Sequence, residues 1–359
     1  MSTHFVTGFP GFIGRRLVAV LLDRDSDARV TVLVEPRLVE PAGEVARRLD
    51  AERIELLAGD ITDRRLGLDD ADYDRLLAEV RRVFHLAAIY DLSVPLAAAQ
   101  RVNVDGTGNV LDFCAAASDL ERLAYVSTAY VAGTRTGVVY EHELVMGQGF
   151  KNHYESTKFQ AEVWVRERKA DVPTTILRPA IVVGDSTTGE TEKFDGPYYI
   201  LRAVSRAQRL HRSVPQFGRA DAPFNVVPVD YVVQAMAAAA GDPATLGQTL
   251  HLVDPDPLTA RELVDLLSRT YAGRPPKGQV PPALIERSLR IDRVRELFAG
   301  TPPESIAYLN HPVTYDARRT VDFLAPHGLT PPKFPDYVDA MVKFYAAHED
   351  DPALRPKGT

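Results

Sequence analysis

A tyrosine and a lysine four residues apart are the first pair in this sequence with the chemistry to move a proton. Tyr154 and Lys158 lie in a stretch whose pattern predicts a helix from Asn152 to Ala170. This spacing puts both side chains on one helix face. A tyrosine has an ordinary pKa of about 10, and a nearby ammonium ion lowers it toward neutrality. The pair therefore predicts a general acid if both groups are buried, although such pairs also arise by chance.

Two hydroxyl side chains, Ser127 and Thr128, lie at the end of the strand predicted just before this helix, at Arg122–Ser127. Open α/β sheets place their chemistry at this carboxyl edge of the strands. The Thr128 hydroxyl is suited to hold a carbonyl oxygen while Tyr154 supplies a proton. Taken alone, Thr128 also fits a β-branched residue that merely ends a strand.

A glycine-rich loop follows the first predicted strand, His4–Thr7, and opens a predicted helix, Gly11–Asp23. Glycines at this spacing let backbone amides approach a pyrophosphate, and the helix N-terminus adds partial positive charge. Ordinary turns also contain three glycines, but the position after the first strand favours a dinucleotide site. The predicted cofactor-binding residues of the loop are Gly8, Phe9, Pro10, Gly11, Phe12, Ile13 and Gly14.

Four further residues follow later strands and are predicted to contact the dinucleotide. Asp60 and Ile61 come after the third strand, where a carboxylate and an amide would meet the adenine. Ala87 and Ala88 end the fourth strand, where small side chains would let the cofactor pass close to the backbone. Taken singly, these residues also fit a turn aspartate and a buried strand end.

The loop after the second strand bears on the choice between the two nicotinamide cofactors. An acidic side chain there accepts hydrogen bonds from the ribose hydroxyls of NAD, whereas an arginine pairs with the 2′-phosphate of NADP. The sequence has Glu35 and Arg37 at this point, and either charge also fits a solvated loop. These residues alone leave the choice between NADP and NAD open.

These motifs lie in an alternation of strands and helices. Several strands are apolar throughout, as expected for parallel strands covered on both faces, so the fold class is α/β with a doubly wound parallel sheet. The predicted strands are His4–Thr7, Val30–Val34, Ile54–Leu57, Arg82–Leu86, Arg122–Ser127, Thr174–Leu177 and Thr249–Val253. The predicted helices are Gly11–Asp23, Tyr73–Glu79, Pro95–Ala117 and Asn152–Ala170.

The composition of the sequence changes after Gly184. Residues 185–225 are rich in Gly, Pro and Thr with charges of both signs, and the pattern of the remainder predicts mainly helix. We predict a dinucleotide-binding domain at 1–185, with 225–254 packing back on it. Residues 186–224 and 255–350 would form a smaller substrate-binding lobe. The polar end, 351–359, is predicted to fray.

Composition excludes several other classes of protein. The 359 residues carry 42 basic and 49 acidic side chains, a net charge of −7, which leaves no basic excess for a nucleic-acid partner. The longest apolar runs fall far short of the roughly 20 residues that span a bilayer. One cysteine, Cys114, excludes an intramolecular disulfide and a cysteine-based metal cluster, and no metal site is predicted. With no signal-peptide pattern at the N-terminus, we expect a cytoplasmic protein.

Taken together, the motifs resemble the extended short-chain dehydrogenase/reductase family from Thr3 to about Asp254. The resemblance implies a catalytic set of Thr128, Tyr154 and Lys158, with Lys158 also holding the nicotinamide ribose. It matches Asn103 to the family's helix asparagine that supports a proton relay; an asparagine bonded to backbone is the alternative.

The segment Arg178–Gly184 also resembles the family segment whose proline and following backbone line the nicotinamide. The resemblance therefore adds Pro179 and Val182 to the predicted cofactor-binding residues.

Within the family, the loop, Thr128 and the segment after Lys158 look most like the fatty acyl and thioester reductases, which reduce carrier-bound or CoA-bound acyl groups with NADPH. Those enzymes usually have arginine where this chain has Glu35. The resemblance implies an NAD(P)-dependent reductase of a carbonyl substrate, an acyl thioester or an aldehyde. An acyl carrier protein or CoA would supply the thioester, and the enzyme would be a monomer or a homodimer.

Two alternatives remain open from the sequence. One is a nucleotide-sugar epimerase or dehydratase, which uses the same catalytic residues with a tightly bound NAD. The other is a non-catalytic sensor that binds NADP and a protein partner; such proteins generally lose the Tyr/Lys pair, which is intact here.

Overall fold

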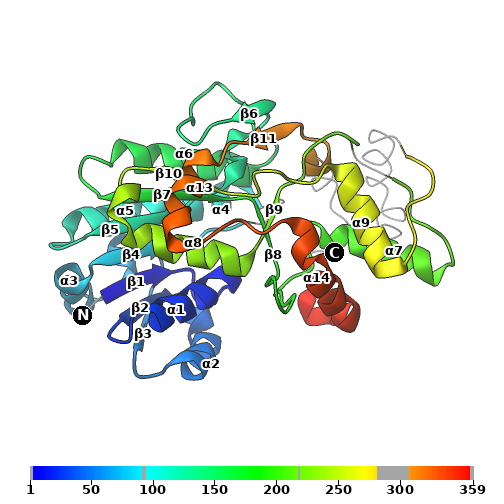
Figure 1. The fold of residues 1–359 in the computed structure, drawn as a ribbon. Coiled ribbons are helices and arrows are strands. Elements are labelled where there is room, and N and C mark those ends of the chain that lie inside the picture. The colour runs from blue at the N-terminus through cyan, green and yellow to red at the C-terminus, as the bar shows by residue number, and fades with distance from the viewer. Residues whose placement is uncertain (1–2, 91–93, 217–218, 281–306, 356–359) are drawn as a thin grey trace.

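The computed structural model describes residues 3–90, 94–216, 219–280 and 307–355 (Figure 1). Parts of the predicted substrate lobe and of the predicted frayed tail lie outside the described residues.

A seven-stranded parallel sheet forms the centre of the molecule, with strand order β10-β7-β5-β4-β1-β2-β3 (Figure 1). Its strands are β1 Thr3–Thr7, β2 Arg29–Val34, β3 Ile54–Ala58, β4 Arg82–His85, β5 Arg122–Val126, β7 Thr174–Pro179 and β10 Thr249–Leu252. Every predicted strand is present, with ends that shift by at most two residues, and the predicted fold class is confirmed. The order reverses between β1 and β4, which is where doubly wound sheets bind ligands.

Helices cover both faces of the sheet because alternate side chains of each strand point to opposite sides. Val6 and Phe84 belong to one apolar cluster, and Phe5 and Val83 belong to another. The first cluster packs under α1 Phe12–Arg24, α2 Val39–Leu49, α8 Val229–Gly241 and α13 Arg318–Leu324, and the second under α3 Asp70–Glu79, α5 Gly106–Ala116 and α6 His153–Glu167.

The helix predicted at Pro95–Ala117 forms as three joined segments. They are α4 Leu96–Ala99, a π-helical stretch η3 Gln100–Asp105, and α5. Asn103 lies in the π-helical stretch. Such widened turns are rare and are found mostly at functional sites, and the hydrophobic pattern alone does not distinguish them from regular helix.

A separate bundle lies to the right in Figure 1, formed by α7 Tyr198–Arg209, α9 Ala260–Ala272 and α14 Phe334–His348 around a third apolar cluster. Two short parallel pairs join segments that are far apart in the chain: β6 Gly137–Val139 with β11 Val313–Tyr315, and β8 Ile181–Val183 with β9 Val226–Pro228. Short 3-10 turns occur at Pro36–Leu38, Arg64–Gly67, Ala129–Ala132, Pro243–Thr245, Ala325–His327 and Pro352–Leu354.

The predicted lobe ranges hold all three helices of this bundle. They also hold β11 and α13, and α13 packs on α8 and β10, against the sheet. The domain boundaries drawn from the sequence stay a prediction, since the chain crosses between bundle and sheet more than once.

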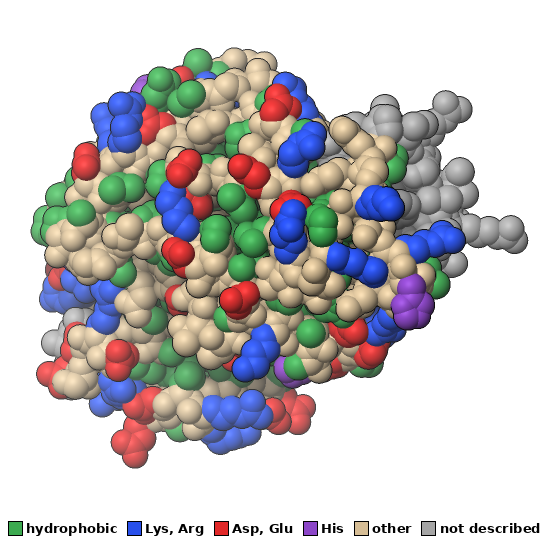
Figure 2. All heavy atoms as spheres, turned by 45° about the vertical axis from the view of Figure 1, so that its right-hand side comes forward, with side chains coloured by type: hydrophobic (Ala, Val, Ile, Leu, Met, Phe, Trp, Pro, Cys, Tyr) green, Lys and Arg blue, Asp and Glu red, His purple; other side chains and the backbone are tan. Residues whose placement is uncertain are grey.

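The surface mixes charges of both signs. Lys and Arg side chains lie beside Asp and Glu side chains over much of the face in Figure 2. Within the described ranges, no helix is long and apolar enough to cross a membrane.

Buried histidines make the stability of the fold depend on pH. Burial lowers the pKa of His4 and His311 to about 4 and that of His85 and His251 to about 3. In the unfolded chain these side chains bind protons below about pH 6.5, whereas in the fold they stay neutral. Stability is therefore lost as pH falls from 6.5 toward the folded values, by about 1.4 kcal/mol per pH unit for each histidine.

Urea unfolding between pH 7 and pH 5 tests this expectation. The free energy of unfolding should fall steadily below pH 6.5, and His85→Gln should make the fall less steep. A free energy that does not change over this range would contradict a neutral, buried state for these histidines.

Candidate active site

The glycine loop packs so tightly that two of its glycines admit no side chain. Gly8 has a φ of +91°, and a Cβ on it would lie 2.9 Å from the backbone nitrogen of Ala87. A Cβ on Gly14 would lie 2.4 Å from the carbonyl oxygen of Gly8. Helix α1 begins after Gly11 without a side-chain cap, so its first backbone amides are open to an anion. Phe9 and Pro10 lie in the turn itself, and Phe12 and Ile13 are the first two residues of α1.

Three charged side chains lie together where β2 and β3 end. Arg37 forms an ion pair with Glu35, with Nε 2.5 Å from Oε2, and both side chains are exposed. This hydrogen bond and the Glu35 charge raise the pKa of Arg37, and Asp60 adds to the effect. Asp60 accepts a hydrogen bond from the backbone of Thr62. The structure thus brings together the predicted adenine and ribose contacts, and the two candidate selectivity residues bind each other.

The remaining predicted cofactor residues lie along the same edge of the sheet. The backbone nitrogen of Ala87 donates to the Thr7 hydroxyl at 3.2 Å, and Ala88 follows it on the partly exposed loop after β4. Pro179 ends β7, and Val182 lies in β8. Ile61 is buried; its side chain packs against Gly106 at the start of α5.

Thr128, in the turn after β5, lies near Tyr154 at the start of α6. Burial raises the pKa of the Tyr154 phenol to about 12, and the nearby Thr128 hydroxyl opposes that effect. Thr128 also caps the 3-10 turn that follows β5, accepting from the backbone nitrogen of Tyr130 at 3.3 Å. The phenol is therefore protonated at neutral pH.

Lys158 lies one turn after Tyr154 on α6 and is buried. Its ammonium donates to the carbonyl oxygen of Val126 at 2.8 Å and lies 4.6 Å from the ring centre of Tyr125. Burial lowers the pKa of Lys158 to about 7, and Glu162 opposes that change. We expected Lys158 to lower the pKa of Tyr154; without a dinucleotide this is wrong, because the lysine points to β5 and burial dominates the titration of Tyr154.

Asn103 joins three segments through its side-chain amide. Its oxygen accepts from the backbone nitrogen of Ile89 at 2.8 Å. Its nitrogen donates to the Ile89 carbonyl at 3.1 Å and to the Thr157 hydroxyl at 3.0 Å. In this state the side chain bonds backbone, as in the simpler alternative, and places the loop after β4 against the catalytic helix. A role in a proton relay stays a prediction.

A buried carboxylate on the catalytic helix was missed in the sequence. Glu162 has no exposed side-chain surface, and its oxygens accept from the Ser127 hydroxyl at 2.6 Å and from Arg178 at 2.6 Å. The signal was present: Glu162 follows Lys158 by the same four residues that separate Lys158 from Tyr154. Arg178 is an isolated charge in an apolar strand, which also marks a buried ion pair.

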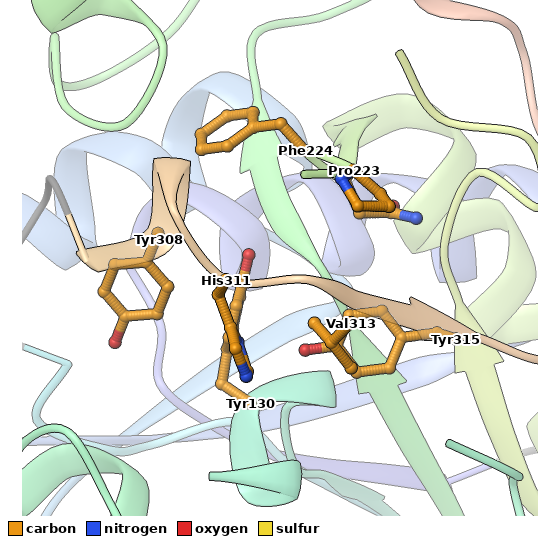
Figure 3. Close-up of a pocket in the computed structure, with 8 residues that line it drawn as sticks. Tyr130, Pro223, Phe224, Tyr308, His311, Val313 and Tyr315 are labelled. Atoms are coloured by element: carbon orange, nitrogen blue, oxygen red, sulfur yellow. The ribbon is translucent and has the colours of Figure 1, made fainter. Parts of the chain in front are cut away.

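Aromatic side chains, among them Tyr130 from the turn after β5, surround a small cavity (Figure 3). Tyr308 donates to the buried carboxylate of Glu155 at 2.9 Å, and its ring centre lies 4.8 Å from that of Tyr130. A cavity with room for about one water molecule lies among Tyr130, Phe224, Tyr308, His311 and Tyr315. Tyr308 is 153 residues from Glu155, so no local pattern in the sequence indicates their contact. Among the described residues, no group of His, Cys, Asp or Glu side chains is arranged to hold a metal ion.

The strand order, the glycine loop and the Thr/Tyr/Lys set define an extended short-chain dehydrogenase/reductase with an NAD(P)-binding domain. Residues 6–236 match the model of an NAD-binding family described as male sterility protein, and the chain belongs to this family.

Solved structures and curated relatives agree with this assignment. The terminal R domain of the myxalamid PKS-NRPS pathway superposes with a TM-score of 0.82, at 26% identity over 98% of this chain and 92% of that one. The fatty acyl-CoA reductase wat of Drosophila melanogaster is 26% identical over 66% of this chain and 54% of its own length. The non-canonical nonribosomal peptide synthetase FrzA of a Cladobotryum species is 28% identical over 70% of this chain, which spans only 26% of that protein.

Gly14→Ala tests the glycine loop. The added methyl group would collide with the Gly8 carbonyl, which cannot move without displacing β1 from β4. We expect dinucleotide affinity to fall by roughly 100-fold or more, about 3 kcal/mol, in a fluorescence or calorimetric titration. Gly43→Ala is the control, because that glycine lies in α2 with its nearest neighbour, the end of the Arg47 side chain, 3.7 Å from an added Cβ. Undiminished binding by Gly14→Ala would contradict the site.

Proposed function

We propose that this protein is an NAD(P)H-dependent reductase of acyl thioesters or of the corresponding aldehydes. The observation that carries the proposal is the placement of Thr128 and Tyr154 near each other at the carboxyl edge of the sheet, with buried Lys158 on the same helix as Tyr154. The R domain and the fatty acyl-CoA reductase among the similar proteins support the thioester as substrate class.

The residues present fit a dinucleotide. Gly8 and Gly14 leave a cradle that a Cβ would fill, the uncapped start of α1 faces it, and the strand order reverses beside it. The pyrophosphate would lie on this loop, the adenine and its ribose near Glu35, Arg37 and Asp60, and the nicotinamide near Pro179. A bound reduced dinucleotide supplies a hydride at its nicotinamide ring.

Tyr154 is the general acid in this proposal. Because burial raises its pKa to about 12, the phenol carries its proton at neutral pH and can donate it to an oxygen that gains negative charge. Thr128, which lies near the phenol, holds the same oxygen in place. Donors positioned where charge develops stabilise the transition state more than the substrate.

Lys158 would hold the nicotinamide ribose by moving its ammonium away from the Val126 carbonyl. The ribose hydroxyls would then pass a replacement proton to the phenol. The lowered pKa of Lys158, about 7, means that the ammonium charge is present below neutral pH and is lost as pH rises.

With a thioester as substrate, the bonds formed and broken would be as follows. Hydride adds to the carbonyl carbon, the carbonyl oxygen takes the proton of Tyr154, and the carbon–sulfur bond then breaks to release a thiol and an aldehyde. A second hydride and a second proton convert the aldehyde to an alcohol. The same side chains serve both rounds, because each places negative charge on the same oxygen.

The thioester would come from an acyl carrier protein or from CoA, in line with the nonribosomal peptide synthetase and the fatty acyl-CoA reductase among the similar proteins. A cytoplasmic location and a monomeric or homodimeric state stay predictions from the sequence.

For the cofactor we propose NADPH. The guanidinium of Arg37 stands at the ribose end of the site but is held by Glu35, so a 2′-phosphate would compete with that carboxylate for the same donor. The expected preference for NADPH is therefore modest.

Tyr154→Phe tests the catalytic assignment. Loss of the hydroxyl removes the proton donor but leaves the glycine loop intact, so we expect kcat to fall by roughly 1,000-fold while NADPH binding changes little. The assay is NADPH oxidation with acyl-CoAs, acyl carrier thioesters and aldehydes. Retained turnover would contradict the role of Tyr154, and a wild-type protein that reduces none of these but purifies with NAD would favour an epimerase.

Arg37→Gln tests the cofactor proposal. It should raise KM for NADPH by roughly tenfold, about 1.4 kcal/mol, and leave KM for NADH nearly unchanged, because only NADPH carries the phosphate. Glu35→Gln should lower KM for NADPH, since it frees the guanidinium. Equal effects of either substitution on both cofactors would show that this loop does not select between them.

A further inference from the structure

We propose that Glu162 is a positioning residue for the reductase reaction: its carboxylate holds the ends of β5 and β7 against the catalytic helix, so that Thr128, Tyr154 and Lys158 meet at one point. This inference rests on the proposed function, and it adds a residue with no direct contact to substrate or cofactor.

The contacts of Glu162 reach the residues that immediately precede Thr128 and Pro179. Oε2 accepts from the Ser127 hydroxyl at 2.6 Å, and Ser127 immediately precedes Thr128. Arg178 binds with both ends of its guanidinium, Nη2 to Oε1 at 2.6 Å and Nε to Oε2 at 3.0 Å, and immediately precedes Pro179.

Arg178 is itself fixed, so it cannot follow the carboxylate if α6 moves. Its Nη2 donates to the carbonyl of Glu143 at 2.8 Å, and its Nη1 lies 3.1 Å from Nε2 of His251 on β10. His251 stays neutral and accepts this bond, because its other ring nitrogen donates to the Asp316 carbonyl at 2.7 Å. The planar guanidinium therefore presents two donors to Glu162 in a fixed orientation.

Stability alone gives no reason for this ion pair. Both side chains are almost fully buried, with 0% and 1% exposure, and burying two charges costs about as much as their attraction returns. A well-packed apolar pair would serve the fold equally well. An apolar pair would not fix an orientation. The Glu162 carboxylate accepts two hydrogen bonds from Arg178 and one each from Ser127 and Arg166, and the bonds from Arg178 and Ser127 fix the rotation of α6 relative to the strand ends.

Glu162 also acts on the charge of Lys158, whose pKa is lowered by burial and raised by the Glu162 carboxylate four residues further along α6. The ammonium is faced from β5 by the Tyr125 ring and the Val126 carbonyl, and from β4 by neutral His85. Glu162 is the anionic group that raises the pKa of Lys158 against the effect of burial. The charges that face Glu162 from other positions are Arg178 on β7 and Arg166 on α6, both cationic.

Ser127→Ala is the mildest test, because it removes one hydrogen bond and keeps both charges. If Ser127 and Glu162 position Thr128, kcat for thioester reduction should fall by about 10- to 100-fold, with KM and the melting temperature little changed. Ser268→Ala is the matched control, since Ser268 is equally buried and donates to the Arg274 carbonyl at 2.9 Å in the helical bundle. Equal kcat values for the two variants would overturn the positioning role.

Glu162→Gln and Glu162→Asp separate charge from shape. Activity that needs the Lys158 ammonium is lost as pH rises through the pKa of Lys158. Because Glu162→Gln removes the nearby negative charge, it should shift the alkaline limb of the kcat–pH profile to lower pH by roughly one unit. Glu162→Asp should keep the limb near its wild-type position while lowering the plateau. A purely structural role would lower the plateau in both variants and leave both limbs in place.

Two further measurements keep the outcomes distinct. An NMR titration of ¹⁵N-labelled lysine side chains reads the pKa of Lys158 without turnover, and that pKa should fall in Glu162→Gln. If the wild type reduces no thioester or aldehyde, the proposed function fails, and the titration still decides the charge effect. If Glu162→Gln does not fold, Ser127→Ala decides the positioning role; an unshifted Lys158 together with an unaffected Ser127→Ala overturns the inference.

Discussion

The backbone of Gly8 lies so close to both Ala87 and Gly14 that no side chain fits on either glycine, and the dinucleotide site depends on this contact. This contact occurs where the strand order reverses between β1 and β4. The segments that follow these two strands leave the sheet in opposite directions, which opens a crevice between them. Parallel pairing brings the ends of β5 and β7 to the same edge. The crevice is therefore reached by Thr128, the start of α6 and Pro179. Their meeting follows from the parallel order of the strands and needs no further contact between distant segments.

Burial explains the electrostatic state of the site. It keeps the Tyr154 phenol protonated, brings the pKa of Lys158 down to about 7 and holds His85 neutral. Only Glu162, with two arginines and a hydroxyl around it, keeps its charge against the same effect, as its lowered pKa indicates. The catalytic helix therefore presents a neutral acid, a cation near its titration point and a fixed anion at successive turns.

Features with local signals could be read from the sequence. Each strand is a short apolar run, the glycine loop has its own spacing, and Tyr154 and Lys158 share a helix face, so their places followed from periodicity. Other features depend on contacts between distant residues. Three such features arise only when the segments pack. They are the hydrogen bonds from Arg178 and Tyr308 to carboxylates on α6, the π-helical turn around Asn103, and the orientation of Lys158 toward Val126. The direction of the Tyr154 pKa was wrong for the same reason, because burial cannot be read from a spacing of four residues.

The central claim is that hydride passes from a nicotinamide to the carbonyl carbon of a substrate held by Thr128 and Tyr154. NADPH carrying deuterium at C4 tests it directly, in separate reactions with each of the two C4 stereoisomers and with an acyl-CoA or acyl carrier thioester. Mass spectrometry of the product should find deuterium on the former carbonyl carbon with one stereoisomer and not with the other. A product without deuterium from either stereoisomer, or label that remains in a nucleotide bound to the protein, would contradict the account.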